Sequence, residues 1–180
     1  MLDGEENLIT DAIGGEASAF GLLYDYYQPK IYRFIFFKTG RREEAEDLTH
    51  QVFLNAWQNV KNYKFQGFPF SSWLYQIARN QIIDHYRTRK ETLNIENVEE
   101  PETVDIPIGD KIDLGLEIKR VKKAILALNE EQQDVIIMRF IDDLSPKEIS
   151  LTLDKPESTI RVLQHRAIKT LQKLLEIKEI

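Results

Sequence analysis

Apolar residues recur every three or four positions along most of this chain, and strict alternation of apolar and polar residues is rare. Helical spacing gathers apolar side chains on one face of a helix, whereas a half-buried strand requires alternation. The pattern therefore predicts an all-α protein.

The first ninety residues contain four such helical periods. Gly14 and Gly15 end the first, Pro29 is expected to bend the second, and Gly40 ends it. An irregular loop from Lys64 to Phe70 follows the third, after which Ser71 or Ser72 can cap the fourth. These signals predict a small bundle with helices over residues 7–13, 16–38, 41–60 and 71–89.

The last third of the chain predicts a helix-turn-helix. An amphipathic helix over residues 114–128 precedes a second helix, capped by Asn129 and Gln132 and reaching Phe140. Ser145, Pro146 and Glu148 form a strong helix start, and that helix ends near Asp154. A final helix begins after Pro156 and carries a cationic face. A generic helical hairpin is the alternative interpretation.

The segment from residue 91 to 113 has a different composition. It contains Pro101, Pro107 and Gly109, many acidic residues and no sustained period. We expect a flexible acidic linker between two domains.

Charge is segregated along the chain, although the net charge is -6. Residues 61–90 carry six basic side chains and one acidic side chain, whereas residues 91–118 carry one basic and nine acidic side chains. The basic stretch also holds six aromatic residues between Phe65 and Tyr86. Cations beside aromatic rings suit phosphates and unstacked bases, which favours single-stranded or opened nucleic acid as the ligand.

The helix within this basic stretch has a polar face. Gln76, Asn80, Ile83 and Arg87 fall in one narrow sector at 100° per residue. Gln and Asn can contact base edges, and Arg can hold phosphate. The alternative is that Trp73 and Tyr86 belong to the core and that the arginines lie on an ordinary solvated surface.

Little in the sequence indicates catalysis or a cofactor. The chain has no cysteine, and His50, His85 and His165 lie on three different predicted helices. The N-terminus is acidic rather than signal-like, and the apolar run from Ile31 to Phe37 is too short to cross a bilayer. We therefore expect a cytoplasmic protein that is not an enzyme and holds no metal or cofactor.

Four sequence blocks, taken in order, resemble the extracytoplasmic-function sigma factors, the two-domain promoter-recognition subunits of bacterial RNA polymerase. They are AFGLLYDYYQPKIYRF, DLTHQVFLNAW, FSSWLYQIARNQIIDHYR and LSPKEISLTLDKPESTIRVLQHRA. The resemblance implies that residues 1–90 form sigma region 2, residues 91–113 a linker, and residues 114–180 sigma region 4. It also implies three partners: core polymerase through its clamp helices and flap, promoter DNA, and an anti-sigma factor.

The resemblance assigns a surface to each task. Core polymerase would be contacted by Asp47, Leu48, His50, Gln51 and Asn55, although members of the family usually carry glutamine and glutamate at the positions of His50 and Gln51. The minus-ten element, with one base flipped into a pocket, would be bound by Lys64, Phe65, Phe70, Trp73, Gln76, Arg79, Asn80 and Arg87.

The minus-thirty-five element would lie in the major groove against the last helix. The implied contacts are Glu157, Ser158, Thr159, Arg161, Val162, His165, Arg166 and Lys169. The family commonly has glycine, serine and arginine where this chain has Ser158, Val162 and Leu163, which suggests a different element preference.

Two rival functions stay open at this point. A helix-turn-helix regulator that binds duplex DNA alone would explain residues 114–180 but leaves the aromatic loop without a task. A helical protein that binds polymerase or an anti-sigma factor without binding DNA would make the acidic linker its main feature.

Overall fold

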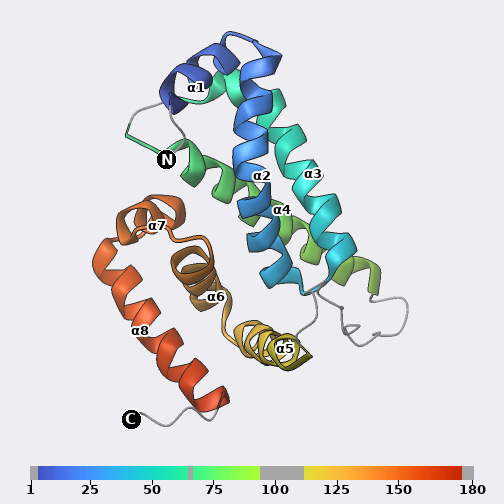
Figure 1. The fold of residues 1–180 in the computed structure, drawn as a ribbon, viewed down its shortest axis with the longest axis vertical. Helices are drawn as coiled ribbons and strands as arrows, with labels where there is room; N and C mark the ends of the chain where they lie inside the picture. Colours follow the sequence, from blue (N-terminus) through green and yellow to red (C-terminus); the bar gives the residue numbers. More distant parts are fainter. Residues whose placement is uncertain (1–3, 65–66, 94–111, 176–180) are drawn as a thin grey trace.

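The computed structural model describes residues 4–64, 67–93 and 112–175, and every regular element within these ranges is helical. The predicted all-α fold is confirmed. The chain forms an N-terminal bundle and a C-terminal helical domain that packs against one end of it (Figure 1).

Within residues 4–64 and 67–93, the N-terminal bundle has four helices and one short 3₁₀ turn. Three of the helices, α2, α3 and α4, pack against one another, and α1 lies across α2. Pro29 lies inside α2, as the sequence predicted. The elements are α1 (Glu5–Ile13), α2 (Ala17–Thr39), α3 (Arg42–Asn59), η1 (Val60–Asn62) and α4 (Phe70–Leu93).

The core of this bundle comes from the apolar faces that the spacing indicated. Ile31 and Phe34 of α2, Val52 of α3 and Leu74 of α4 are each completely buried. The ring of Phe34 packs edge-on against Tyr75 at 5.3 Å between centroids. Burying these side chains removes apolar surface from water, which is the main force that holds the helices together.

The start of α4 differs from the prediction. The helix begins at Phe70, and the Trp73 N–H donates to the Pro69 carbonyl. Neither Ser71 nor Ser72 precedes the helix. Ser72 is instead fully buried, and its hydroxyl donates to the Glu148 carbonyl of the C-terminal domain at 3.3 Å. A partner more than seventy residues away therefore holds a side chain that local sequence assigned to capping.

The C-terminal domain contains two confirmed cap predictions. The Asn129 side chain accepts from the Gln132 N–H, and Ser145 with Glu148 forms a reciprocal capping box. The predicted stop at Asp154 is also observed, with this residue in the left-handed conformation at φ 50°. The elements are α5 (Ile112–Leu126), α6 (Glu130–Ile136), the π-helical turn η2 (Ile137–Ile141), α7 (Pro146–Leu153) and α8 (Glu157–Leu174).

The two halves of the chain are in direct contact. α2 contacts α5 and η2, and α4 contacts α7. Most of the predicted linker, residues 94–111, lies outside the described residues. The helix α8 lies on the side of its domain that faces away from the bundle (Figure 1).

Candidate polymerase and nucleic-acid interfaces

The outer face of α3 carries the predicted polymerase contacts. Asp47, His50 and Gln51 are exposed, and Asn55 is half-buried. Leu48 is only 2% exposed and belongs to the core, so its side chain supports this face from beneath and cannot reach a partner.

Two apolar residues extend the same α3 face and were absent from the predicted set. Leu54 is 49% exposed and Trp57 is 37% exposed. Leu54 follows Asp47 and His50 by seven and four residues, which is the spacing of one helical face. That spacing was visible in the sequence and was the available signal for Leu54 and Trp57. Exposed Leu and Trp among polar neighbours are typical of a protein interface.

The aromatic residues at the start of α4 form a packed cluster. Phe70 is only 1% exposed and contacts the rings of Tyr27, Tyr63 and Trp73 at 5.4–5.7 Å between centroids. A base cannot stack on a ring that is covered on all sides, so Phe70 supports this cluster instead. Trp73 is partly exposed beside it, Lys64 is exposed, and Phe65 lies outside the described residues.

Tyr63 is a member of this cluster that the prediction missed. Its ring lies 5.1 Å from that of Trp73, and its hydroxyl donates to the Phe68 carbonyl. It therefore connects the end of η1 to the loop before α4. An aromatic residue directly before the Lys64–Phe70 loop was the available signal.

The polar face of α4 divides into an open half and a covered half. Asn80 and Arg87 are exposed. The Gln76 amide instead donates to the Thr152 carbonyl at 3.3 Å, and the Arg79 Nε lies 2.6 Å from the Asp134 Oδ2. Two of the predicted DNA contacts are thus occupied by the C-terminal domain, which the sequence did not indicate.

Two aspartates of the C-terminal domain are buried at this boundary. Asp134 also pairs with Lys38, at 2.8 Å from Nζ to Oδ1. Asp142 accepts from the Arg33 Nε at 3.2 Å, but burial outweighs this attraction and raises the pKa of Asp142 to about 6. Lys122, whose pKa is lowered by burial, donates to the Gly40 carbonyl at 2.7 Å. Charged and polar side chains thus cross the boundary between the domains at several points, beside an apolar core that contains residues of both halves.

The predicted face of α8 is open to solvent. Ile160, Leu163 and Ala167 are buried against the rest of the domain. Arg161 is mostly exposed and pairs loosely with Glu157 at 3.6 Å. The predicted contacts with exposed side chains are Ser158, Arg161, Val162, His165, Arg166 and Lys169, whereas Glu157 and Thr159 are half-buried.

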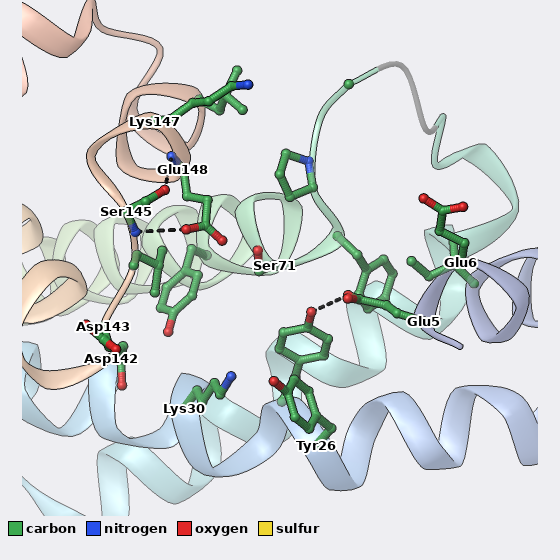
Figure 2. A pocket seen from close by; sticks show the side chains of 18 of the residues that line it. Glu5, Glu6, Tyr26, Lys30, Ser71, Asp142, Asp143, Ser145, Lys147 and Glu148 are labelled. Carbon is green, nitrogen blue, oxygen red and sulfur yellow. Dashed lines mark hydrogen bonds between the residues drawn. The ribbon is translucent and has the colours of Figure 1, made fainter. Parts of the chain in front are cut away.

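A cleft of about 1130 Å³ lies between the bundle and the C-terminal domain (Figure 2). Asp142, Asp143 and Glu148 line one side of it, and Glu5 and Glu6 line the other. Lys30 and Lys147 are its basic residues. An acidic lining repels phosphate, so this cleft is unsuited to nucleic acid.

No group of three or more potential metal ligands occurs among the residues that the structure describes. Within the same residues, no helix has the length and hydropathy needed to cross a membrane.

Two known protein families match this chain, one in each half. The Sigma-70 region 2 family matches residues 23–92, and the Sigma-70 region 4 family matches residues 124–173. The curated sigma factor SigW of Bacillus subtilis is 30% identical over 171 residues, which cover 89% of this chain and 91% of SigW. The chain belongs to the ECF RNA polymerase sigma factors. The family resemblance seen in the sequence is confirmed.

A second relative of this sigma factor is BldN of Streptomyces coelicolor. It is 36% identical over 170 residues, which cover 93% of this chain and 64% of BldN. The sigma factor therefore spans about two thirds of the length of that relative. Proteins of this family are transcription initiation factors rather than enzymes, which agrees with the expectation from the sequence.

Two solved structures share the fold. CnrH, in complex with the cytosolic domain of CnrY, has a TM-score of 0.75 at 20% identity, covering 97% of this chain and 99% of CnrH. RpoE of Bartonella quintana, in complex with the anti-sigma factor NepR, has a TM-score of 0.74 at 21% identity, covering 89% and 98%. At these identities the likeness establishes the fold of the sigma factor.

Proposed function

We propose that this chain binds core RNA polymerase, directs it to specific promoters and promotes melting of the minus-ten element. One observation carries the proposal: regions 2 and 4 occur in one chain, each with a separate exposed polar face. A duplex-binding regulator would not need the α3 face, and a polymerase-binding mimic would not need the cationic face of α8.

Polymerase contact is proposed for the α3 face defined by Asp47, His50, Gln51 and Asn55, extended by Leu54 and Trp57. The two apolar residues supply area to bury, and the polar residues supply hydrogen bonds at the rim. Leu48 is left out as a direct contact because it is buried.

Minus-ten recognition is proposed for the aromatic and cationic surface of α4. Trp73 is partly exposed and can stack on an extruded base, while Asn80 can bond a base edge. Arg79 and Arg87 are suited to phosphates. Lys64, Phe65 and Gln76 complete the proposed set, and Phe70 is left out because the cluster covers its ring.

Minus-thirty-five recognition is proposed for α8. Its N-terminal residues Ser158, Arg161 and Val162 present exposed side chains in the part of a recognition helix that reaches base edges. His165, Arg166 and Lys169 lie further along and suit the DNA backbone. Glu157 and Thr159 are half-buried at the start of the helix.

Promoter-directed transcription with purified core polymerase tests the function. Core polymerase with this chain should start RNA synthesis at defined sites on host genomic DNA, and core polymerase alone should not. A protein that shifts duplex DNA without polymerase would be a regulator. A protein that binds polymerase without changing the start sites would be a mimic. Either result would overturn the proposal.

Two alanine variants separate the proposed tasks. Asn80→Ala should reduce promoter opening, measured by permanganate reactivity, while leaving polymerase affinity unchanged. Arg161→Ala should reduce discrimination of the upstream element by about 1–3 kcal/mol, measured by competition between promoters. Equal losses of polymerase affinity in both variants would contradict this division.

We also propose a cytoplasmic location, because a sigma factor works with polymerase and DNA, and regulation by an anti-sigma factor. The solved complexes of CnrH and RpoE support the second point by analogy of fold. Affinity purification of the chain from its host should recover such a partner, and recovery of core polymerase alone would count against it.

A further inference from the structure

Two cations of region 2 share a single carboxylate of region 4. Lys38 at the end of α2 and Arg79 in the middle of α4 approach opposite oxygens of Asp134, at 2.8 Å and 2.6 Å. The side chain of Asp134 is completely buried, and that of Lys38 is only 4% exposed. Asp134 and Lys38 have therefore lost nearly all contact with water and depend on each other, whereas the side chain of Arg79 is 26% exposed and also lies 3.8 Å from Glu130.

The partners of this carboxylate lie beside the proposed minus-ten surface. Arg79 is one turn from Gln76 and one residue from Asn80 on α4. The Gln76 amide is also held by region 4, through the Thr152 carbonyl at 3.3 Å. Region 4 therefore covers part of the surface that region 2 would offer to DNA.

A DNA phosphate resembles this carboxylate in the feature that Lys and Arg recognise. It presents two anionic oxygens to which Lys and Arg donate charge-assisted hydrogen bonds. A site that holds one anion between Lys38 and Arg79 is suited to hold the other. The two anions cannot occupy it together, because both would need the same donors.

The distance between the two promoter elements is a separate reason for the domains to move apart. The minus-ten and minus-thirty-five elements lie about 25 base pairs apart, or about 85 Å at 3.4 Å per base pair. A compact chain of 180 residues is only about 40 Å across. The eighteen residues between Leu93 and Ile112 can span roughly 60 Å when extended. The closed molecule cannot reach both elements, whereas separated domains can.

We infer that Lys38 and Arg79 form a phosphate-binding site for the promoter strand, and that Asp134 occupies this site in the closed molecule and blocks DNA binding. This inference rests on the proposed function, since it assumes that α4 meets DNA. Lys38 becomes an additional DNA contact, and Asp134 becomes the residue that keeps the free protein closed.

The test replaces the carboxylate without changing its shape. Asp134→Asn removes the charge between Lys38 and Arg79 and should favour separation of the domains. Asp143→Asn is the matched control, because it makes the same charge change on a side chain of region 4 that is 98% exposed. Asn also tolerates the left-handed backbone of Asp143, at φ 57°.

Separation of the two domains can be measured by energy transfer between two dyes. The chain has no cysteine, so two introduced cysteines take up the dyes selectively. Dyes are attached to Asp11→Cys on α1 and Lys173→Cys on α8, both at exposed positions. Transfer efficiency should fall in Asp134→Asn and remain at the wild-type value in Asp143→Asn. Unchanged efficiency in Asp134→Asn would overturn the inference.

Phosphate binding is measured with single-stranded dT12 and with the same strand carrying a neutral methylphosphonate backbone. Asp134→Asn should bind dT12 at least about fivefold more tightly than wild type, since affinity scales with the open fraction. Adding Lys38→Gln should remove most of this gain, and the neutral strand should show none. An equal gain in Asp143→Asn, or opening without a gain for dT12, would overturn the phosphate site.

These measurements use the free chain and contain no polymerase. Failure of wild-type protein to direct initiation would overturn the proposed function while leaving the measured switch in place. A second outcome would overturn the switch alone. In it, wild-type protein initiates at defined promoters, but Asp134→Asn changes neither the energy transfer nor the affinity for dT12.

Discussion

Asp134 and Asp142 are both buried at the same domain boundary, but their surroundings differ. Asp134 lies between two cations, at 2.8 Å from Lys38 and 2.6 Å from Arg79. Asp142 has one cationic partner, Arg33, whose side chain is 43% exposed, together with the buried Tyr75 and the more distant Lys30. Attraction from Arg33 does not compensate Asp142 for its loss of water, so its pKa rises.

The raised pKa of Asp142 predicts that acidification favours the closed molecule. This pKa is about 6 in the closed form and should return toward 3.8 when separation exposes the carboxyl group. The closed form then binds the proton more tightly, so its advantage grows as pH falls from about 6 toward 4. Lowering pH from 7.5 to 5 should raise the closed-to-open ratio on the order of tenfold, measured by energy transfer.

Asp142→Asn provides the control for this pH effect. The amide stays neutral at every pH, so the variant should remain closed at pH 7.5 and lose most of the response between pH 7.5 and 5. A variant with the full wild-type response would show that a titratable group other than Asp142 is responsible.

At the scale of the element, helix caps that depend on neighbouring residues were predicted correctly, whereas contacts between distant segments were not. The caps at Asn129 and Ser145 involve atoms three residues apart, and both are observed. The start of α4 was misplaced because Ser72 bonds to Glu148 across the domain boundary. Local sequence cannot reveal such a partner.

The capping box of α7 should contribute measurably to the stability of region 4. Ser145→Ala removes the acceptor of the Glu148 N–H, at 3.2 Å, and should cost about 1 kcal/mol in the free energy of unfolding. Urea denaturation followed by circular dichroism measures this cost. Ser158→Ala, at an exposed position of α8, should change the stability much less. Equal losses would argue against the capping role.

Gly40 ends α2 at a place where region 4 approaches closely. Its φ is 75°, and an added Cβ would lie 3.2 Å from the Leu126 Cδ1 of α5. Gly40→Ala should therefore destabilise the protein by about 1–2 kcal/mol in urea denaturation. Gly21→Ala, inside α2 with open space around it, should instead be neutral or stabilising by up to about 1 kcal/mol. Similar losses in both variants would contradict this difference.

At the scale of the whole molecule, the closed arrangement leaves some surfaces free and covers others. The outer faces of α3 and α8 are exposed, whereas Gln76 and Arg79 of α4 are engaged by region 4. With polymerase on α3 and the minus-ten element on α4, as proposed, the free protein can meet polymerase before its DNA surface is available. Such an order would limit DNA binding by the sigma factor alone.

Binding of core polymerase should separate the two domains. Polymerase is expected to hold region 2 on its clamp helices and region 4 on its flap, and the closed molecule cannot span both promoter elements. Energy transfer between dyes at residues 11 and 173 should fall when core polymerase is added to wild-type protein. Asp134→Asn should show a smaller fall because it starts more open. An unchanged signal with bound polymerase would contradict this prediction.

The sequence by itself determined the helical class, the family, the helix caps at Asn129 and Ser145, and most of the exposed face of α8. These features depend on periodicity and on groups within a few residues of each other, where spacing alone fixes geometry. Only the tertiary structure decided that Phe70 is covered, and that Lys38, Arg79 and Asp134 share one buried site. The partners in that site come from three helices far apart in the chain, so their meeting depends on how the domains pack.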